Sequence, residues 1–294
     1  MKTKELYRAQ ISAHVEVAIL MLFIGYSLWS LTTRFRLSKD ATKGEREVEF
    51  TIVCQPNRIF LSAEWRHLLM LNYVVEPDLL LPYVPPGTSL DSFCGRTYVS
   101  LVGFRFTCTR LFGFLPVPFH TNFDEVNLRL YVRRKADDEH RRGVVFIAEV
   151  VPRRAIATIA RLVYGENYTS SPMRHQVAME GPKKTTRYQW RVGGQWCKLS
   201  AQTTGAPKYP AEGSLEQFIT EHYWGYSNRP GRACLEYQVA HDPWQVWAST
   251  EAEFEGDAGS LYGCELGAAL QRRSDSAFVA EGSPVVVFRG NRIS

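Results

Sequence analysis

Apolar and polar positions alternate most regularly between Asp124 and Arg134. Because successive side chains of a strand point to opposite faces, this alternation predicts a β-strand with one apolar and one polar face. The apolar face is expected to meet the core, whereas the polar face fits either water or a lined cavity. The apolar row is Val126, Leu128, Leu130 and Val132, and the polar row is Glu125, Asn127, Arg129, Tyr131 and Arg133.

The pattern changes twice within Gly143–Gln176. Val144–Val151 is an apolar run rich in β-branched residues, which favours a buried strand, and Pro152 ends it. Apolar residues at helical spacing then predict a helix over Arg153–Tyr164. The polar segment Glu166–Ser171 follows, and a loop this polar between apolar elements is either solvated surface or the wall of a site.

The remaining folded region consists mainly of short strand-like segments. Ser214 and Gln217 form a capping-box pattern, which predicts a helix over Leu215–Tyr223, and Pro77–Val84 has the early proline of a second short helix. Many strands and few helices predict an α+β fold with a large antiparallel sheet. The other expected strands are Phe60–Ala63, Met70–Val75, Tyr98–Phe106, His175–Glu180, Thr185–Val192, Trp196–Thr203, Ala233–Val239, Gln245–Phe254 and Pro284–Arg289, while Ala258–Leu270 is ambiguous.

The N-terminal residues differ from the rest of the chain. Val15–Leu31 is apolar apart from Glu16 and a few small or hydroxyl-bearing residues, and basic residues flank it. The run is short for a bilayer, which takes about 20 residues, so a membrane anchor and a dispensable extension both stay open. As an anchor it would hold the C-terminal part in the cytoplasm, because basic residues are denser after it. With Ser38–Glu49 as a charged linker, we expect an extension over residues 1–49 and a folded domain over residues 50–294.

Composition narrows the function classes. At 294 residues and 45% hydrophobic content the chain can bury a full core, and its net charge of +5 is a mild excess. No basic stripe interleaved with aromatic residues is present, so we expect no nucleic-acid partner. Six cysteines without C-x-x-C spacing favour reduced thiols in a cytosolic compartment. Since the sequence has no metal-ligand spacing, no phosphate-binding glycine loop and no nucleophile elbow, we expect no metal and no cofactor.

Several long blocks resemble the YqjF-type family, a family of unknown function. The blocks follow one another in the same order from about Ile59 to Ile293 and leave residues 1–49 outside. That family is similar in fold to acetoacetate decarboxylase, which implies a cone-like antiparallel β-barrel around an internal cavity with a few outer helices. The blocks include FLSAEWRHLLMLNYVVEPDLLLPYVPPGTSLD, TYVSLVGFRF, PVPFHTNFDEVNLRLYVRR, RRGVVFIAEVVPRRAIATIARLVYGENYTSSPMRH, EHYWGY, HDPWQVW and SAFVAEGSPVVVFRG.

The resemblance also bears on chemistry. Acetoacetate decarboxylase forms a Schiff base through a lysine of a Pro-Lys-Lys sequence that follows a helix, and the corresponding place here is Pro172-Met173-Arg174. Neither methionine nor arginine can form the imine. An early arginine of the decarboxylase corresponds to Val74, whereas its acidic strand position is kept as Glu125. A Pro-Lys-Lys does occur at residues 182–184, but in an expected turn, where lysines are solvated and poor nucleophiles.

The polar row and the polar loop supply the candidate site. We expect Arg174 and Glu125 to orient a ligand, with Arg174 either contacting a carboxylate or pairing with Glu149 or Glu166. Alternatives without a ligand stay open. Glu125, Asn127 and Arg129 fit a solvated ladder of side chains across neighbouring strands, and the two histidines fit a structural role. The candidate ligand-binding residues are Glu125, Asn127, Arg129, Glu166, Asn167, Tyr168, Arg174, His175 and His120.

Three functions stay open at this point. The first is a binding module whose cavity holds a small apolar or carboxylate-bearing metabolite, without Schiff-base chemistry. The second is an enzyme of the lyase or hydratase type that uses Glu125, Glu166 or His175 for acid-base chemistry in the same cavity. The third is a membrane-tethered interaction domain, anchored through Val15–Leu31. The sequence leaves catalysis, the ligand and the oligomeric state undetermined.

Overall fold

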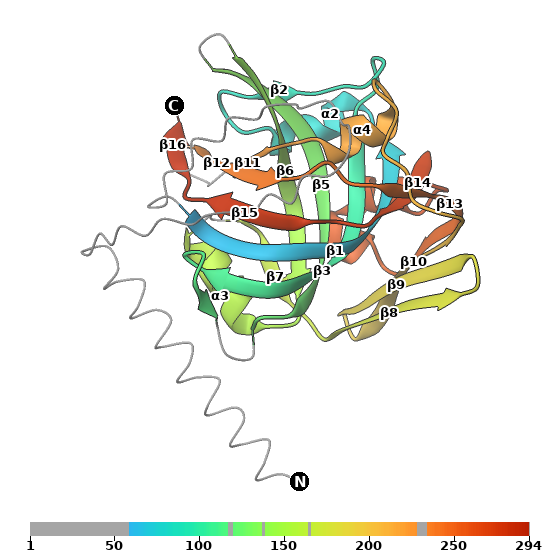
Figure 1. Cartoon of the computed structure of the whole chain (residues 1–294). Coiled ribbons are helices and arrows are strands. Elements are labelled where there is room, and N and C mark those ends of the chain that lie inside the picture. The colour runs from blue at the N-terminus through green and yellow to red at the C-terminus, as the bar shows by residue number, and fades with distance from the viewer. Residues whose placement is uncertain (1–58, 117–119, 137–138, 164–165, 228–233, 294) are drawn as a thin grey trace, which may run out of the picture.

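The computed structural model describes residues 59–116, 120–136, 139–163, 166–227 and 234–293 (Figure 1). The expected anchor Val15–Leu31 and the expected linker Ser38–Glu49 therefore lie outside the described residues. Within the described ranges, no helix combines the length and the apolar content needed to cross a membrane.

Seven of the described strands close a barrel, in the order β1-β3-β5-β6-β11-β12-β15 and back to β1 (Figure 1). Neighbours run antiparallel except β6 and β11, which are parallel. Closure leaves these strands without free edges and encloses a central space. The predicted α+β fold with an antiparallel barrel is confirmed. The seven strands are β1 (Ile59–Val74), β3 (Tyr98–Leu111), β5 (Phe123–Ala136), β6 (Glu139–Val151), β11 (Trp224–Ser227), β12 (Cys234–His241) and β15 (Pro284–Phe288).

A second sheet branches from the barrel at β1. The residues Leu68–Asn72 of β1 pair with β14, which leads outward through β13 and β10 to β9 and β8. We call these strands the outer sheet. It lies beside the barrel in Figure 1 and begins where β15 no longer pairs with β1. Its strands are β8 (Met173–Glu180), β9 (Lys183–Val192), β10 (Gln195–Thr204), β13 (Val246–Glu255) and β14 (Ser276–Ala280).

Short helices and strands complete the described fold. The helices are α2 (Pro77–Leu80), which continues into the 3₁₀ turn η2 (Leu81–Tyr83), α3 (Arg154–Val163), α4 (Leu215–Thr220), α5 (Gly259–Tyr262) and α6 (Cys264–Leu270). The short strands are β2 (Ser89–Leu90), β4 (Leu115–Pro116), β7 (Tyr168–Ser170) and β16 (Asn291–Ile293).

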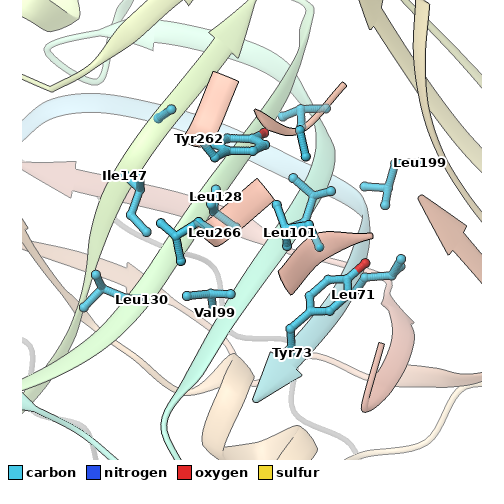
Figure 2. Packing of buried hydrophobic residues seen from close by; sticks show 14 of the residues in the cluster. Leu71, Tyr73, Val99, Leu101, Leu128, Leu130, Ile147, Leu199, Tyr262 and Leu266 are labelled. Atoms are coloured by element: carbon cyan, nitrogen blue, oxygen red, sulfur yellow. The ribbon is translucent and has the colours of Figure 1, made fainter. Parts of the chain in front are cut away.

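The largest hydrophobic core lies outside the barrel, between its wall and the outer sheet. The apolar row of β5 is fully buried there, together with side chains of β10, α5 and α6. Figure 2 shows Leu128 and Leu130 of β5 in this layer with Leu199 of β10 and Leu266 of α6. We call it the outer core. Glu125, Asn127 and Arg129 of the polar row consequently point into the barrel and line a cavity, whereas Arg133 at the end of the row is exposed to solvent.

Several expected boundaries were wrong. Phe60–Ala63 and Met70–Val75 are parts of the one strand β1, because β1 stays paired with β3 across a register shift near His67, whose φ is 57°. The capping box is confirmed, since Ser214 Oγ accepts a hydrogen bond from the Gln217 amide at 3.2 Å. The helix that it begins ends at Thr220 rather than Tyr223.

Candidate functional site

A cavity of about 170 Å³ lies inside the barrel. Most of its wall is apolar, with large side chains such as Trp65, Phe104, Phe106 and Trp244. The aromatic groups contact one another closely, for example Phe106 and Phe123 with ring centroids 4.5 Å apart. The polar residues that line it are Thr109, His120, Glu125, Asn127, Arg129, Glu149, Glu166, Tyr168, Thr220, His222, Tyr237 and His241.

Strand pairing gathers one polar wall. Asn127 of β5 lies directly opposite Glu149 of β6, and Glu149 lies opposite Tyr168 of β7. Paired residues of neighbouring strands share a face, so the three side chains stand side by side. Glu125 precedes Asn127 by two positions and therefore points the same way. Three strands thus build a wall that faces the cavity.

Hydrogen bonds hold the carboxyl group of Glu125 in this wall. Asn127 Nδ2 donates to Glu125 Oε1 at 3.0 Å, and the Tyr168 hydroxyl donates to Glu125 Oε2 at 3.2 Å. The Tyr237 hydroxyl of β12 donates to Glu166, which lies just before β7. We call Glu125, Glu149 and Glu166 the carboxyl cluster.

The surroundings of the carboxyl cluster disfavour the ionised forms of Glu125 and Glu149. Glu125 and Glu149 are almost fully buried, with 2% and 1% of their surface exposed. The pKa of Glu125 is raised to about 8, mainly by burial and also by the negative charge of Glu166, while the hydrogen bond from Asn127 acts in the opposite direction. Burial, followed by the charges of Glu166 and Glu125, holds the pKa of Glu149 well above its ordinary value. Desolvated carboxyl groups close to one another favour the protonated form.

Two acceptor atoms in this wall lack a hydrogen-bond partner in the described structure. They are Asn127 Oδ1 and Glu149 Oε2, and both belong to residues that line the cavity. A buried polar atom without a partner costs free energy, about 1–3 kcal/mol, unless a bound molecule or water satisfies it. The wall can therefore receive a hydrogen-bond donor at Asn127 Oδ1 and, when Glu149 is ionised, at Glu149 Oε2.

The other polar end of the cavity contains Arg129, His222 and His241. Arg129 Nη2 donates to the Ile219 carbonyl at 3.4 Å, while its Nε has no partner among the described residues. Burial lowers the pKa of His222 and of His241 to about 4, so both rings are neutral at pH 7. The His241 ring stacks on Trp244, with centroids 4.2 Å apart. This end is thus mainly a donor and aromatic surface.

Six of the nine candidate residues line the cavity, and three lie elsewhere. Asn167 is exposed and its Nδ2 donates to the Ile147 carbonyl at 3.1 Å, which attaches the loop to β6. Arg174 and His175 lie on β8, the last strand of the outer sheet. The six residues that line the cavity are His120, Glu125, Asn127, Arg129, Glu166 and Tyr168.

Arg174 and His175 make surface contacts instead. Arg174 Nε donates to Gln189 at 2.8 Å, and its guanidinium lies 4.3 Å from the centroid of the Trp196 ring. His175 Nδ1 lies 2.9 Å from Asp124 Oδ2, on the outward face of β5. Both residues are exposed and neither lines the cavity with Glu125, so they lie outside the candidate site.

Polar residues outside the predicted set also line the cavity, including Glu149, Thr220, His222, Tyr237 and His241. Glu149 is the one charge in an otherwise apolar strand, and that isolation was a usable signal. Tyr237 and His241 reach the cavity through the pairing of β12 with β11 and β15, and Thr220 and His222 lie at and just after the end of α4, which no local pattern places at a cavity.

Lysines lie away from this site. The described residues that line the cavity include no lysine. The expectation that residues 182–184 form a solvated turn was wrong for Lys184, which is 4% exposed because β9 already begins at Lys183. Its Nζ lies 3.5 Å from the centroid of the Trp247 ring, and burial lowers its pKa. Lys184 belongs to the outer sheet and does not line the cavity.

Solved structures with the same fold are known. Acetoacetate decarboxylase from Legionella pneumophila is 14% identical and covers 88% of this chain and 98% of its own, with a TM-score of 0.57. The enduracididine biosynthesis enzyme MppR, complexed with the condensation product of pyruvate and imidazole 4-carboxaldehyde, is 13% identical, covers 86% and 99%, and has a TM-score of 0.58. An acetoacetate decarboxylase-like enzyme from Sphingomonas wittichii RW1 is 13% identical, covers 84% and 98%, and has a TM-score of 0.55. At these identities the likeness establishes the fold alone.

Sequence comparison places the chain in a family. The uncharacterized protein YqjF of Bacillus subtilis is 25% identical over 202 residues, which are 67% of this chain and 79% of YqjF. Residues 62–284 match the DUF2071 family, described as an uncharacterized conserved protein. The chain therefore belongs to the DUF2071 family and has the barrel fold of acetoacetate decarboxylase-like proteins.

Proposed function

We propose that the protein binds a small organic molecule with a mainly apolar body inside the barrel. The space of about 170 Å³ lies below the roughly 300–1,000 Å³ of drug-sized pockets, so the ligand is small. Aromatic and aliphatic side chains form most of the wall and would take the body of the ligand by burying its apolar surface.

One observation carries this proposal. Asn127 Oδ1 and Glu149 Oε2 are buried, lack a partner within the described structure and belong to residues that line the cavity. A barrel that needed only stability would fill its interior with apolar side chains, since uncompensated buried polar atoms cost free energy. Polar atoms that converge on an apolar cavity are the usual arrangement of a small-molecule site.

The proposal does not include a Schiff base. An imine needs an amine in the cavity, and the described lining residues provide none. Arg174 at the place of the decarboxylase lysine lies on the surface of β8 instead. The expectation that Arg174 binds a carboxylate of the ligand loses its basis for the same reason.

Acid-base catalysis in the same cavity is a second candidate, of the lyase or hydratase type. The observation that favours it is the pKa of Glu125, raised by burial to about 8. A group that titrates near the working pH can both give and take a proton. The test is turnover of a metabolite pool by the wild type and by Glu125→Gln, where equal and null activity counts against this candidate.

A membrane tether is a separate proposal that concerns residues outside the described ranges. We propose that residues 50–294 are the working domain, in the cytoplasm, and that residues 1–49 attach it to the membrane. Cell fractionation of the full chain and of a chain without residues 1–49 tests this. A full chain that stays in the soluble fraction contradicts the tether.

Ligand binding is tested with a variant in which a larger side chain fills the cavity. Hexan-1-ol is a suitable probe because it combines an apolar chain with one hydroxyl group, and calorimetry measures its affinity. In Ile156→Trp, a larger side chain enters the cavity from α3, and we expect hexan-1-ol binding to be lost. Leu81→Trp is the control, because Leu81 is 56% exposed and does not line the cavity. Equal binding by both variants contradicts a site in the barrel.

A further inference from the structure

Glu125 and Glu149 are buried where the described residues offer little positive charge. Glu166 raises the pKa of both groups, and Arg129 is the one permanently charged cation among the described residues that line the cavity. Arg129 has the smallest influence on the pKa of Glu125, and its Nη2 already donates to the Ile219 carbonyl. A buried carboxylate is costly without a positive charge beside it, so Glu125 and Glu149 favour a cation next to them.

The unpartnered atoms of the wall specify the hydrogen bonds that such a cation must make. Asn127 Nδ2 is bound to Glu125, which fixes the amide so that Oδ1 remains the free side. Glu149 Oε2 is the second free atom. Both are acceptors when Glu149 is ionised, so the complementary group is a donor. An ammonium group brings three N–H donors and a positive charge, whereas a hydroxyl brings one donor and a carboxylate brings none.

A metal ion fits the site less well. Across the described parts of the chain, no three His, Cys, Asp or Glu residues are placed to hold one. Hydrocarbon and aromatic side chains form most of the remaining wall, including Phe104, Phe106 and Trp244. Such a wall suits the body of an organic molecule that carries its charge at one end.

We infer that the ligand of this cavity is a small primary amine, whose ammonium group is bound by Glu149 Oε2 and Asn127 Oδ1 and whose hydrocarbon body lies against the aromatic wall. This inference rests on the proposed function, since it names the chemical class of the ligand for the same cavity. Glu125 and Glu166 support the ammonium by charge, while Tyr168 and Tyr237 hold those two carboxyl groups in place.

The test uses three probes with the same chain length, namely hexylamine, hexan-1-ol and hexanoate, and calorimetry on the full-length protein at pH 7. We expect hexylamine to bind about tenfold more tightly than hexan-1-ol, which corresponds to about 1.4 kcal/mol, and hexanoate to bind more weakly than both. In Glu149→Gln the preference for hexylamine over hexan-1-ol should fall below about threefold.

Controls separate charge at the site from charge elsewhere. Glu251→Gln removes an equal charge from an exposed position of β13 and should leave the tenfold preference intact. If Glu149→Gln fails to fold, Glu166→Gln gives the same comparison. A thermal melt of each variant shows whether it is folded.

The outcomes distinguish the two claims. Equal affinity for hexylamine and hexan-1-ol, or tighter binding of hexanoate, overturns the amine inference and leaves the cavity as a binding site. A preference that Glu149→Gln or its substitute does not reduce also overturns it. If none of the three probes binds, both the proposed function and the amine inference fail.

Discussion

The two sides of β5 differ in what they contact. On the outside, Leu128 and Leu130 are fully buried in the outer core (Figure 2). On the inside, Asn127 and Glu125 are just as buried, yet they line a cavity. Asn127 Oδ1 has no hydrogen-bond partner in the described structure. One strand therefore has its stabilising face outside the barrel and its polar face inside. The barrel interior is consequently free to specialise for binding.

The largest change in the free energy of unfolding is expected when a leucine of the outer core is replaced, compared with a leucine that lines the cavity. Leu128→Ala opens a hole in the outer core and should lower the free energy of unfolding by about 3–5 kcal/mol. Leu68→Ala should cost nearer to about 2 kcal/mol, because Leu68 lines a space that is already partly empty. Urea unfolding of both variants measures the difference. Equal losses would mean that the interior is packed like the outer core.

Close packing of the outer sheet on the barrel gives the next prediction. A Cβ at Gly103 of β3 would lie 2.6 Å from Tyr188 Cδ2 of β9, so Gly103→Ala should cost about 1–3 kcal/mol. Gly259→Ala is the control, because its Cβ would meet only Asp257 Oδ1 at 3.5 Å. Thermal unfolding compares the two. A neutral Gly103→Ala would contradict the close contact between the layers.

Stability should depend on pH through the carboxyl cluster. The pKa of Glu125, about 8, lies above its unfolded value, so the folded protein binds more protons and is destabilised as pH rises towards 8. Below about pH 7.5 the buried histidines act in the opposite direction. The pKa values of His67, His222 and His241 are lowered to about 4, so stability is lost as pH falls from 6.5 towards 4.

The unfolded histidines, with a pKa near 6.5, are almost fully deprotonated only above about pH 7.5, so the window from about pH 7.5 to about pH 8 isolates the glutamates. There we expect the free energy of unfolding to fall with pH, by at most about 1.4 kcal/mol per pH unit for each group. The charge of Glu166 raises the pKa of Glu125 and of Glu149, Arg129 lowers that of Glu125, and burial raises the pKa of Tyr168, which stays neutral. Glu125→Gln should flatten the slope in urea titrations. A slope that the variant leaves unchanged would place the titrating group elsewhere.

The smallest change in stability is expected for a substitution on the surface of the outer sheet. Arg174→Ala removes an exposed contact with Trp196, worth about 0.5–1 kcal/mol, and should leave binding of hexan-1-ol unchanged. Calorimetry and a thermal melt check both parts. Loss of ligand binding in Arg174→Ala would return Arg174 to the site, as the resemblance to the decarboxylase implied.

The sequence allowed a large part of this site to be predicted, through the alternation on β5. Glu125, Asn127 and Arg129 were expected on one face, and they do share one. That this face is the inside of the barrel depends on the long-range pairing of β1 with β3 and β15, and no local pattern shows it.

The misplaced and missed residues have physical reasons too. Arg174 and His175 were placed by their position after the helix, yet β8 leaves the barrel and becomes the edge of the outer sheet. Glu149 enters the site through its register with Asn127, which depends on how the β5 and β6 hairpin pairs. Side chains that follow from periodicity were thus predictable, whereas those that follow from strand partners were not.

The most direct test of the account is a crystal structure of the protein with hexylamine. We expect one molecule inside the barrel, with its nitrogen about 3 Å from Glu149 Oε2 and Asn127 Oδ1 and its carbon chain beside Phe104 and Trp244. A barrel that holds no amine at saturating concentration, or an amine whose nitrogen points away from Glu149, would contradict the account.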